Sequence, residues 1–206
     1  MKDSFTCREC GRPFNVAPAV LARYPGWTPP LCNNCRSVGP RTRAAGIRAG
    51  AIGGVSASQG PQTGVFTDGA CEGNPGPGGW GVVKVVDDMV VEQASGASPQ
   101  TTNNRMELTA LIEGMERLAP DEEITVYTDS ALCANTINLW APAWERQGWR
   151  RGHKKEPIAN LDLVRRLYDL ARAHPLAQIE WIRGHAGNRW NEYADQLSRA
   201  YQSATA

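Results

Sequence analysis

The chain has 206 residues with a net charge of +1, which is enough for one well-buried domain and a small appendage. It holds no apolar run of about 18 residues, the length that a membrane span needs. The N-terminal sequence MKDSFTCREC also lacks the apolar core of a secretory signal. Composition therefore argues against a membrane-spanning or secreted protein, and we expect a soluble cytoplasmic one.

The charges divide unequally along the chain. Residues 1–63 carry eight basic and two acidic side chains (net +6), whereas the remainder carries 14 basic and 19 acidic side chains (net −5). The basic N-terminal part is therefore predicted to be attracted to a polyanion, and the acidic remainder to use its carboxylates for another purpose.

Four cysteines form two CxxC pairs near the N-terminus, namely Cys7 with Cys10 and Cys32 with Cys35. Each pair can offer two thiolates to a tetrahedral zinc ion. Disulfides are the alternative, and the missing secretory signal disfavours them. The surrounding segment resembles the small zinc-ribbon modules attached to many proteins. We therefore expect a zinc ribbon over residues 1–36.

Residues 37–63 are predicted to be a flexible linker, because they are rich in glycine and contain no acidic residue. A linker of this length has a mean span on the order of 30 Å. The N-terminal module could thus reach a ligand bound by the main domain, which we place at residues 64–206.

Three antiparallel strands are expected at the start of the main domain. The segment GVFTDGA is a short apolar strand carrying Asp68, GNPGPGG is a tight turn, and GWGVVKVV and MVVEQAS are the next two strands. The glycine-rich turn lacks the GK[ST] ending of a phosphate-binding loop, so nucleotide binding is not expected there.

Helices and strands then alternate. The segment TTNNRMELTALIEGMERLAP has apolar residues at helical spacing, with Glu107 in its first turn on the buried side. ITVYTDS is a buried strand that ends at Asp129 and is followed by a helix from Ser130. A helix over 160–173, a strand over 177–184 and a helix over 188–201 complete a mixed sheet with helices on both faces. Carboxylates beside apolar residues are costly to bury alone, so the fold either separates them or binds divalent cations.

Four segments, TDGACEGNPGPGGWG, TTNNRMEL, YTDS and GHAGNRWNEYADQLS, occur in the same order as the motifs of bacterial type 1 ribonuclease H, which the chain resembles over residues 64 to 200. The resemblance implies a five-stranded mixed sheet and cleavage of the RNA strand of an RNA–DNA hybrid. It assigns metal ligation to Asp68, Glu107, Asp129 and Asp195, and an auxiliary catalytic role to His185. Oxygen ligands favour Mg²⁺ or Mn²⁺, and two such ions can assist phosphodiester hydrolysis.

Substrate binding is expected from a basic, tryptophan-rich segment, residues 139–160, which resembles the basic protrusion of the bacterial family. We assign Trp140 to packing. Gln100 stands where the family commonly has arginine, which predicts a weaker phosphate pocket. The expected contacts, taken from the resemblance and the basic segment, are Asn74, Thr102, Asn103, Asn104, Trp144, Trp149, Arg150, Lys154, Lys155 and Asn160.

Two other functional classes stay open. A noncatalytic hybrid-binding module would keep the basic segment and lose a carboxylate, yet none is missing. An accessory factor would use its ribbon to bind a protein partner, whose nature the sequence does not give. Integrase-like nucleases share the fold but lack the GHAGN and NEYADQLS motifs. Nothing in the sequence argues against a monomer.

Overall fold

The computed structural model describes residues 4–6, 11–15 and 60–204. The chain divides into two units, residues 1–52 and 53–206. The described part of the first unit is a pair of short antiparallel strands, β1 (Ser4–Thr6) and β2 (Pro13–Asn15). The rings of Phe5 and Phe14 face each other across this pair, with centroids 6.0 Å apart.

The four cysteines that we expect to bind zinc, Cys7, Cys10, Cys32 and Cys35, lie outside the described residues. Most of the expected linker does so as well. The zinc ribbon and the linker therefore stay predictions.

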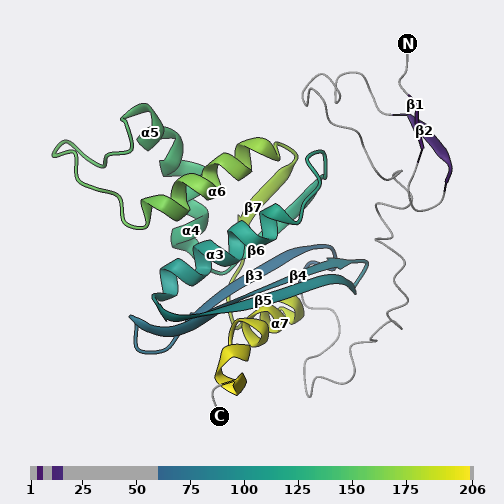
Figure 1. Cartoon of the computed structure of the whole chain (residues 1–206), viewed down its shortest axis with the longest axis horizontal. Helices are drawn as coiled ribbons and strands as arrows, with labels where there is room; N and C mark the ends of the chain where they lie inside the picture. The colour runs from purple at the N-terminus through teal and green to yellow at the C-terminus, as the bar shows by residue number, and fades with distance from the viewer. Residues whose placement is uncertain (1–3, 7–10, 16–59, 205–206) are drawn as a thin grey trace. The chain divides into compact units, whose positions relative to one another are not determined.

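A five-stranded mixed sheet forms the centre of the second unit, with strand order β5-β4-β3-β6-β7 (Figure 1). The first three strands are antiparallel, whereas β6 runs parallel to β3 and β7 runs parallel to β6. The expected five-stranded mixed sheet is thus confirmed. The strands are β3 (Gly64–Cys71), β4 (Gly76–Val86), β5 (Met89–Thr101), β6 (Ile124–Thr128) and β7 (Ala177–Trp181).

Strand β5 is longer than the MVVEQAS segment predicts, because it continues through Pro99 to Thr101. Proline cannot donate a hydrogen bond to a neighbouring strand, but β5 lies at the edge of the sheet, where a missing donor is tolerated. The strand consequently ends one residue before Thr102, which caps the next helix.

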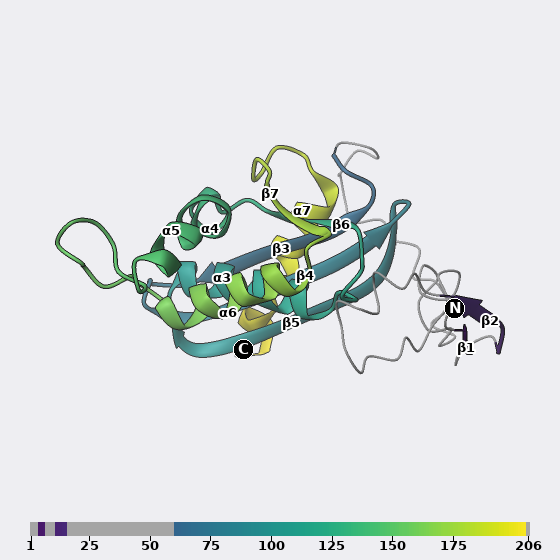
Figure 2. The ribbon, with the colours of Figure 1, turned by 90° about the horizontal axis from the view of Figure 1, so that it is seen from above.

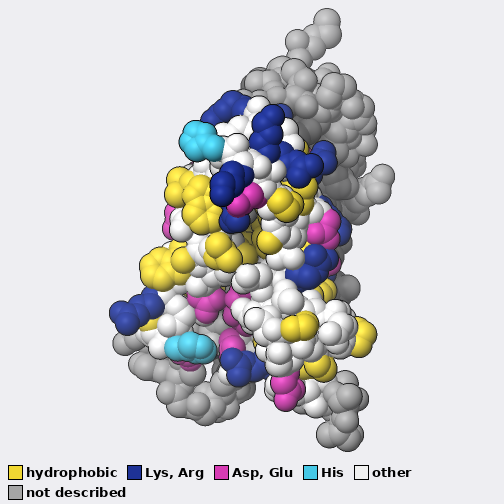
Figure 3. Space-filling view, turned by 90° about the vertical axis from the view of Figure 1, so that its left-hand side faces the viewer, with side chains coloured by type: hydrophobic (Ala, Val, Ile, Leu, Met, Phe, Trp, Pro, Cys, Tyr) yellow, Lys and Arg dark blue, Asp and Glu magenta, His cyan; other side chains and the backbone are white. Residues whose placement is uncertain are grey.

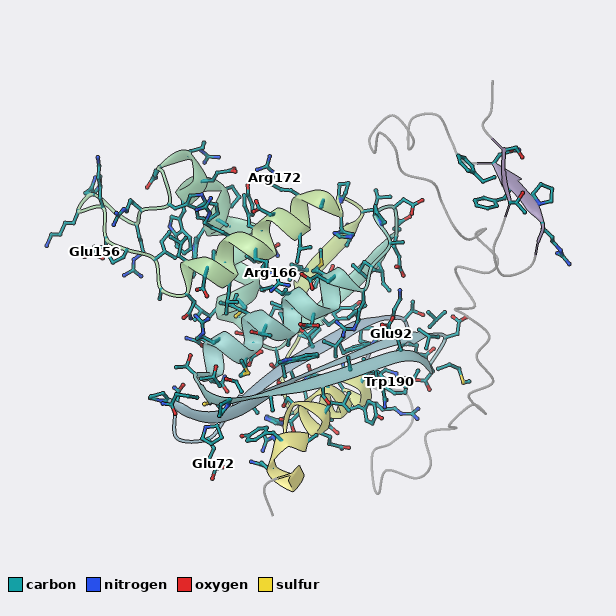
Figure 4. All side chains as sticks on the ribbon, viewed as in Figure 1. Glu72, Glu92, Glu156, Arg166, Arg172 and Trp190 are labelled. Carbon is teal, nitrogen blue, oxygen red and sulfur yellow. The ribbon has the colours of Figure 1, made fainter. Side chains whose placement is uncertain are left out.

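Helices cover both faces of the sheet, as predicted. Helix α3 (Asn103–Glu116) and helix α6 (Leu161–Ala173) lie beside each other on one face, and α7 (Arg189–Ser198) lies on the other (Figures 1 and 2). Arg166 of α6 reaches Glu116 of α3 with an N–O distance of 2.6 Å (Figure 4 labels Arg166). Among the described residues, no helix has the length and hydrophobicity that crossing a membrane requires.

The apolar core has two parts, because neighbouring strand residues point to opposite faces. Val65 and Val82 pack with the residues of α3, whereas the adjacent Phe66 and Val83 pack with Trp190 of α7. A sheet with both faces buried needs apolar runs, which explains why VFT and GVVKVV do not show a simple polar alternation.

The helix expected from Ser130 is interrupted. Ser130 caps α4 (Ala131–Asn135), a π-helical turn η1 (Thr136–Trp140) follows, and α5 (Ala141–Arg146) then completes the segment. The assignment of Trp140 to packing was wrong, because 39% of this side chain is exposed. A π turn contains an extra residue per turn and so changes which side chains face the core.

The turn between β4 and β5 is tied to the start of α7 by Asp88. Its carboxylate accepts hydrogen bonds from the indole Nε1 of Trp190, at 2.8 Å, and from Arg189, at 2.9 Å. Trp190 is 2% exposed and lies between α7 and the sheet (Figure 4). Asp88 therefore satisfies a buried N–H donor and fixes where α7 begins.

Candidate active site

Asp68 lies on the central strand β3, opposite Gly81 of β4. Only 5% of the residue is exposed. Its Oδ2 atom accepts a hydrogen bond from the Ser198 hydroxyl at 2.6 Å. The strand thus presents a carboxylate that is buried and already held on one side.

Glu107 is the fifth residue of α3, just beyond the first turn in which the sequence places it, and it is buried as expected, at 6% exposed. Thr102 begins the helix by accepting a hydrogen bond from the Arg105 amide. Gly69 lets this turn approach β3, because a β-carbon there would lie 2.2 Å from the backbone nitrogen of Glu107. A side chain at position 69 would push Glu107 away from Asp68.

Asp129 follows β6; two residues from the C-terminal part of the domain donate hydrogen bonds to it, and a glycine there leaves room for its carboxylate. The Nδ2 of Asn191 donates to its Oδ2 at 3.1 Å, and the Nε1 of Trp181 donates to its backbone oxygen at 3.0 Å. A β-carbon at Gly184 would lie 2.5 Å from Oδ2. Asn191 therefore holds the carboxylate, Trp181 holds the backbone, and only a glycine fits at position 184 beside them.

These three carboxylates converge. One oxygen each from Asp68, Glu107 and Asp129 lies within 4.8 Å of the others. The Oε2 of Glu107 is buried and accepts no hydrogen bond from any residue that the structure describes. A buried, unpaired carboxylate oxygen is costly unless a cation binds it. The all-oxygen donor set thus fits Mg²⁺ or Mn²⁺.

Burial changes the acidity of two of these groups. The pKa of Asp68 is raised from the ordinary value of 3.8 to about 6, chiefly by burial and also by the charges of Asp129 and Asp195, against the lowering effect of the Ser198 hydrogen bond. Burial and the charges of Asp68 and Asp129 also hold the pKa of Glu107 well above its ordinary value. The protein without cations therefore retains protons at this cluster that an unfolded chain would release.

A pH dependence of stability follows for the protein in chelator. The folded state keeps the Asp68 proton up to about pH 6, whereas the unfolded state loses it near 3.8, so the free energy of unfolding should fall as pH rises through this interval. Asp68→Asn should remove the contribution of Asp68 to this fall in the free energy of unfolding, and should stabilise the metal-free protein by roughly 1–3 kcal/mol at neutral pH. Urea unfolding of both proteins from pH 4 to 8 measures the difference. Parallel pH profiles of the two proteins would contradict a raised pKa at Asp68.

Asp195 and His185 line the same cavity as the three carboxylates, a space of about 380 Å³. Asp195 lies on α7 and forms an ion pair with Arg199 one turn later, at 2.8 Å. It is not among the carboxylates whose oxygens lie within 4.8 Å of one another. His185 lies in the loop before α7 and has a positive φ of 51°. On this face, acidic side chains gather near a histidine (Figure 3).

The residues expected to bind substrate fall into separate groups. Asn103 lines the carboxylate cavity, and its backbone N–H donates to the Oδ1 of Asn74 at 2.9 Å, next to the cis bond between Asn74 and Pro75. A second, largely apolar cavity of about 450 Å³ is lined by Asn104, Trp140, Trp144, Arg151 and Asn160, among others. Trp149 does not line it but packs edge-on against Tyr168.

Basic side chains continue this face beyond the second cavity. Arg150, Lys154 and Lys155 are exposed in the segment between α5 and α6. Figure 3 shows hydrophobic side chains above the acidic group and then Lys and Arg side chains at the far end. An acidic centre, an apolar surface and a basic surface therefore lie on one side of the domain.

Three polar residues of α7 and its end were not predicted as part of the site. Asn191, Ser198 and Arg199 contact Asp129, Asp68 and Asp195, respectively. They lie four residues before and three and four residues after Asp195, which places them on one helical face with it. That spacing is a signal available in the sequence.

Comparisons with known proteins agree with this architecture. The RNase H family model matches residues 60–203. Ribonuclease H of Paracoccus denitrificans is 50% identical over 139 residues, which are 66% of this chain and 88% of that protein.

Two solved structures are similar to the chain. LC11-RNase H1 in complex with an RNA/DNA hybrid has a TM-score of 0.51 and 25% identity over 69% of this chain and 98% of that one. RNase H1 from Halobacterium salinarum has a TM-score of 0.50 and 26% identity over 68% of this chain and 96% of that one. With the sheet order, the carboxylate cluster and these matches in agreement, the chain belongs to the ribonuclease H family of hydrolases.

Proposed function

We propose that the protein is an endonuclease that hydrolyses the RNA strand of RNA–DNA hybrids with two divalent cations, leaving 5′-phosphate and 3′-hydroxyl ends. Two observations of one cluster carry the proposal: one oxygen each of Asp68, Glu107 and Asp129 converge, and the Oε2 of Glu107 is buried without a hydrogen-bond partner among the described residues. The similar LC11-RNase H1 was solved with an RNA/DNA hybrid, which supports this substrate class.

Asp68, Glu107, Asp129 and Asp195 are the ligands in this proposal. Mg²⁺ or Mn²⁺ ions held there would supply a more acidic attacking water and would stabilise the departing 3′-oxygen. The chain itself brings the carboxylates together before binding, so little ordering is needed when cations and substrate arrive. His185 lines the same cavity and could carry a proton to or from the reacting groups.

Substrate positioning is assigned to the surface beside this cavity. Asn74 and Asn103 form one hydrogen-bonded pair at its rim, where they would contact the hybrid's minor groove. Thr102 and Asn160 would hold a phosphate of the DNA strand. Trp144 would contact its sugars, and Trp149 would support the same channel. The exposed Arg150, Lys154 and Lys155 would bind phosphates without regard to sequence.

The test is cleavage of an end-labelled RNA–DNA hybrid beside duplex RNA and duplex DNA of the same sequence, each with Mg²⁺ and with chelator. We expect cuts only in the RNA strand of the hybrid and only when Mg²⁺ is present. Equal cutting of all three duplexes would overturn the proposed substrate. Cutting in chelator would overturn the proposed role of the carboxylates.

The N-terminal part is proposed to hold zinc through Cys7, Cys10, Cys32 and Cys35 and to add nonspecific affinity for nucleic acid, on the basis of its charge of +6. Deleting residues 1–63 should then raise the KM for the hybrid and reduce its salt dependence, while kcat stays nearly unchanged. Steady-state kinetics at several salt concentrations measure both effects. If neither changes, the alternative of an accessory factor whose ribbon binds a protein partner is favoured instead.

A further inference from the structure

A buried hydroxyl connects the last turn of α7 to the central carboxylate. Ser198 has no exposed surface, and its Oγ lies 2.6 Å from the Oδ2 of Asp68 and 2.8 Å from the backbone oxygen of Asp195. A serine hydroxyl has a single proton to donate. An ionised carboxylate is a stronger acceptor than a backbone oxygen, so the Ser198 hydroxyl donates its hydrogen bond to Asp68 whenever Asp68 is charged.

The position of this hydroxyl is set by the close approach of two backbones. A β-carbon at Gly81 would lie 2.6 Å from the Ser198 nitrogen, and one at Gly79 would lie 2.4 Å from the Ser198 oxygen. Gly81 is also the residue paired with Asp68 across the β3–β4 ladder. Two glycines on one face of β4 therefore let α7 rest directly on the sheet beside Asp68.

We infer that Ser198 is a positioning residue, which holds one oxygen of Asp68 so that the carboxylate keeps a single orientation toward the cavity. This inference rests on the proposed cation-dependent function. Asn191 makes the corresponding contact with Asp129 from the first turn of the same helix, at 3.1 Å. Helix α7 thus braces two carboxylates contributed by two different strands, in addition to supplying Asp195.

A carboxylate held in place loses less rotational freedom when it binds a cation, so removing the hydroxyl should weaken cation binding. Ser198→Ala keeps a small side chain with a high helix propensity and deletes only the donor. We expect the affinity for Mn²⁺, measured by calorimetry on the full chain without nucleic acid, to fall about tenfold. Gln196→Ala, an exposed position on the same helix, is the control and should bind Mn²⁺ like the wild type.

Kinetics provide a second readout that a general loosening of the helix would not give. At limiting Mg²⁺ the Ser198→Ala variant should cleave hybrid about tenfold more slowly, and higher Mg²⁺ should restore the rate, while the KM for the hybrid stays unchanged.

Two results would overturn the positioning role. One is wild-type affinity for Mn²⁺ in the Ser198→Ala variant, and the other is a cleavage defect that no Mg²⁺ concentration restores. These results differ from failure of the proposed function, in which the wild type itself would neither cleave hybrid nor bind Mn²⁺.

Discussion

Hybrid cleavage should fall at least about a thousandfold when Asp129 is replaced by asparagine, which corresponds to roughly 4 kcal/mol of lost transition-state stabilisation. The substitution keeps the size of the side chain and an oxygen within reach of Asn191, but it removes one of three converging negative charges. The fold should be retained, because the loss of a charge from a crowded acidic cluster relieves repulsion. Single-turnover cleavage in Mg²⁺, with circular dichroism as a check of folding, measures the effect.

Asp169→Asn is the matched control. Asp169 is an exposed carboxylate on α6, on the face of the sheet opposite α7, and it lines neither of the two cavities discussed above. The same chemical change there should leave cleavage within about twofold of the wild type, as expected for a surface position away from the reacting groups. Retention of more than a tenth of wild-type activity by Asp129→Asn would refute the assignment of Asp129 as a cation ligand.

Gly69→Ala should destabilise the protein by about 2 kcal/mol or more and should also abolish cleavage. The added β-carbon would meet the backbone nitrogen of Glu107 at 2.2 Å and the carbonyl carbon of Met106 at 2.4 Å. Backbone atoms near the start of a capped helix cannot rotate away as a flexible side chain can. The helix must therefore shift, and Glu107 must shift with it, so stability and activity are lost together.

Gly114→Ala tests whether this effect is specific to position 69. A β-carbon there would meet methyl groups of Thr67 and Val65 at 3.1 and 3.2 Å, so side chains rather than backbone must adjust. The gain of about 1 kcal/mol in helix propensity offsets part of that cost. Urea unfolding in chelator should show a much smaller change for this variant. Equal losses in the free energy of unfolding for Gly69→Ala and Gly114→Ala would argue that the close approach of α3 at Gly69 has no special importance.

Much of the fold could be predicted because its signals are local. Short apolar runs, apolar residues at helical spacing, and the capping residues Thr102 and Ser130 indicate the strands and helices that the structure shows. The convergence of Asp68, Glu107 and Asp129 was expected from the family resemblance, because the residue pattern alone left open whether the fold keeps these carboxylates apart. The structure places Asp68 inside β3 and Glu107 just beyond the first turn of α3, rather than at a strand end and in a first turn.

Other features could not be predicted because they depend on packing between distant segments. The exposure of Trp140 follows from a π turn, which no local propensity indicates. The contact of Ser198 with Asp68 joins residues 130 positions apart and depends on how closely α7 approaches Gly79 and Gly81. The length of β5 through Pro99 likewise depends on its place at the edge of the sheet.

The hydrogen bonds of Asp88 connect the β4–β5 hairpin to the helix that carries Asp195, although the hairpin does not contact the active site. Because one carboxylate binds both Arg189 and Trp190, the β4–β5 turn is tied directly to the start of the helix that carries Asp195, and loss of that carboxylate would leave the buried indole N–H without its acceptor. A substitution of Asp88 would therefore disturb the start of α7, while the packing of Trp190 and Ala194 against Phe66 and Val83 keeps the helix on the sheet. Such a substitution would mimic an active-site defect in any screen that scores turnover alone.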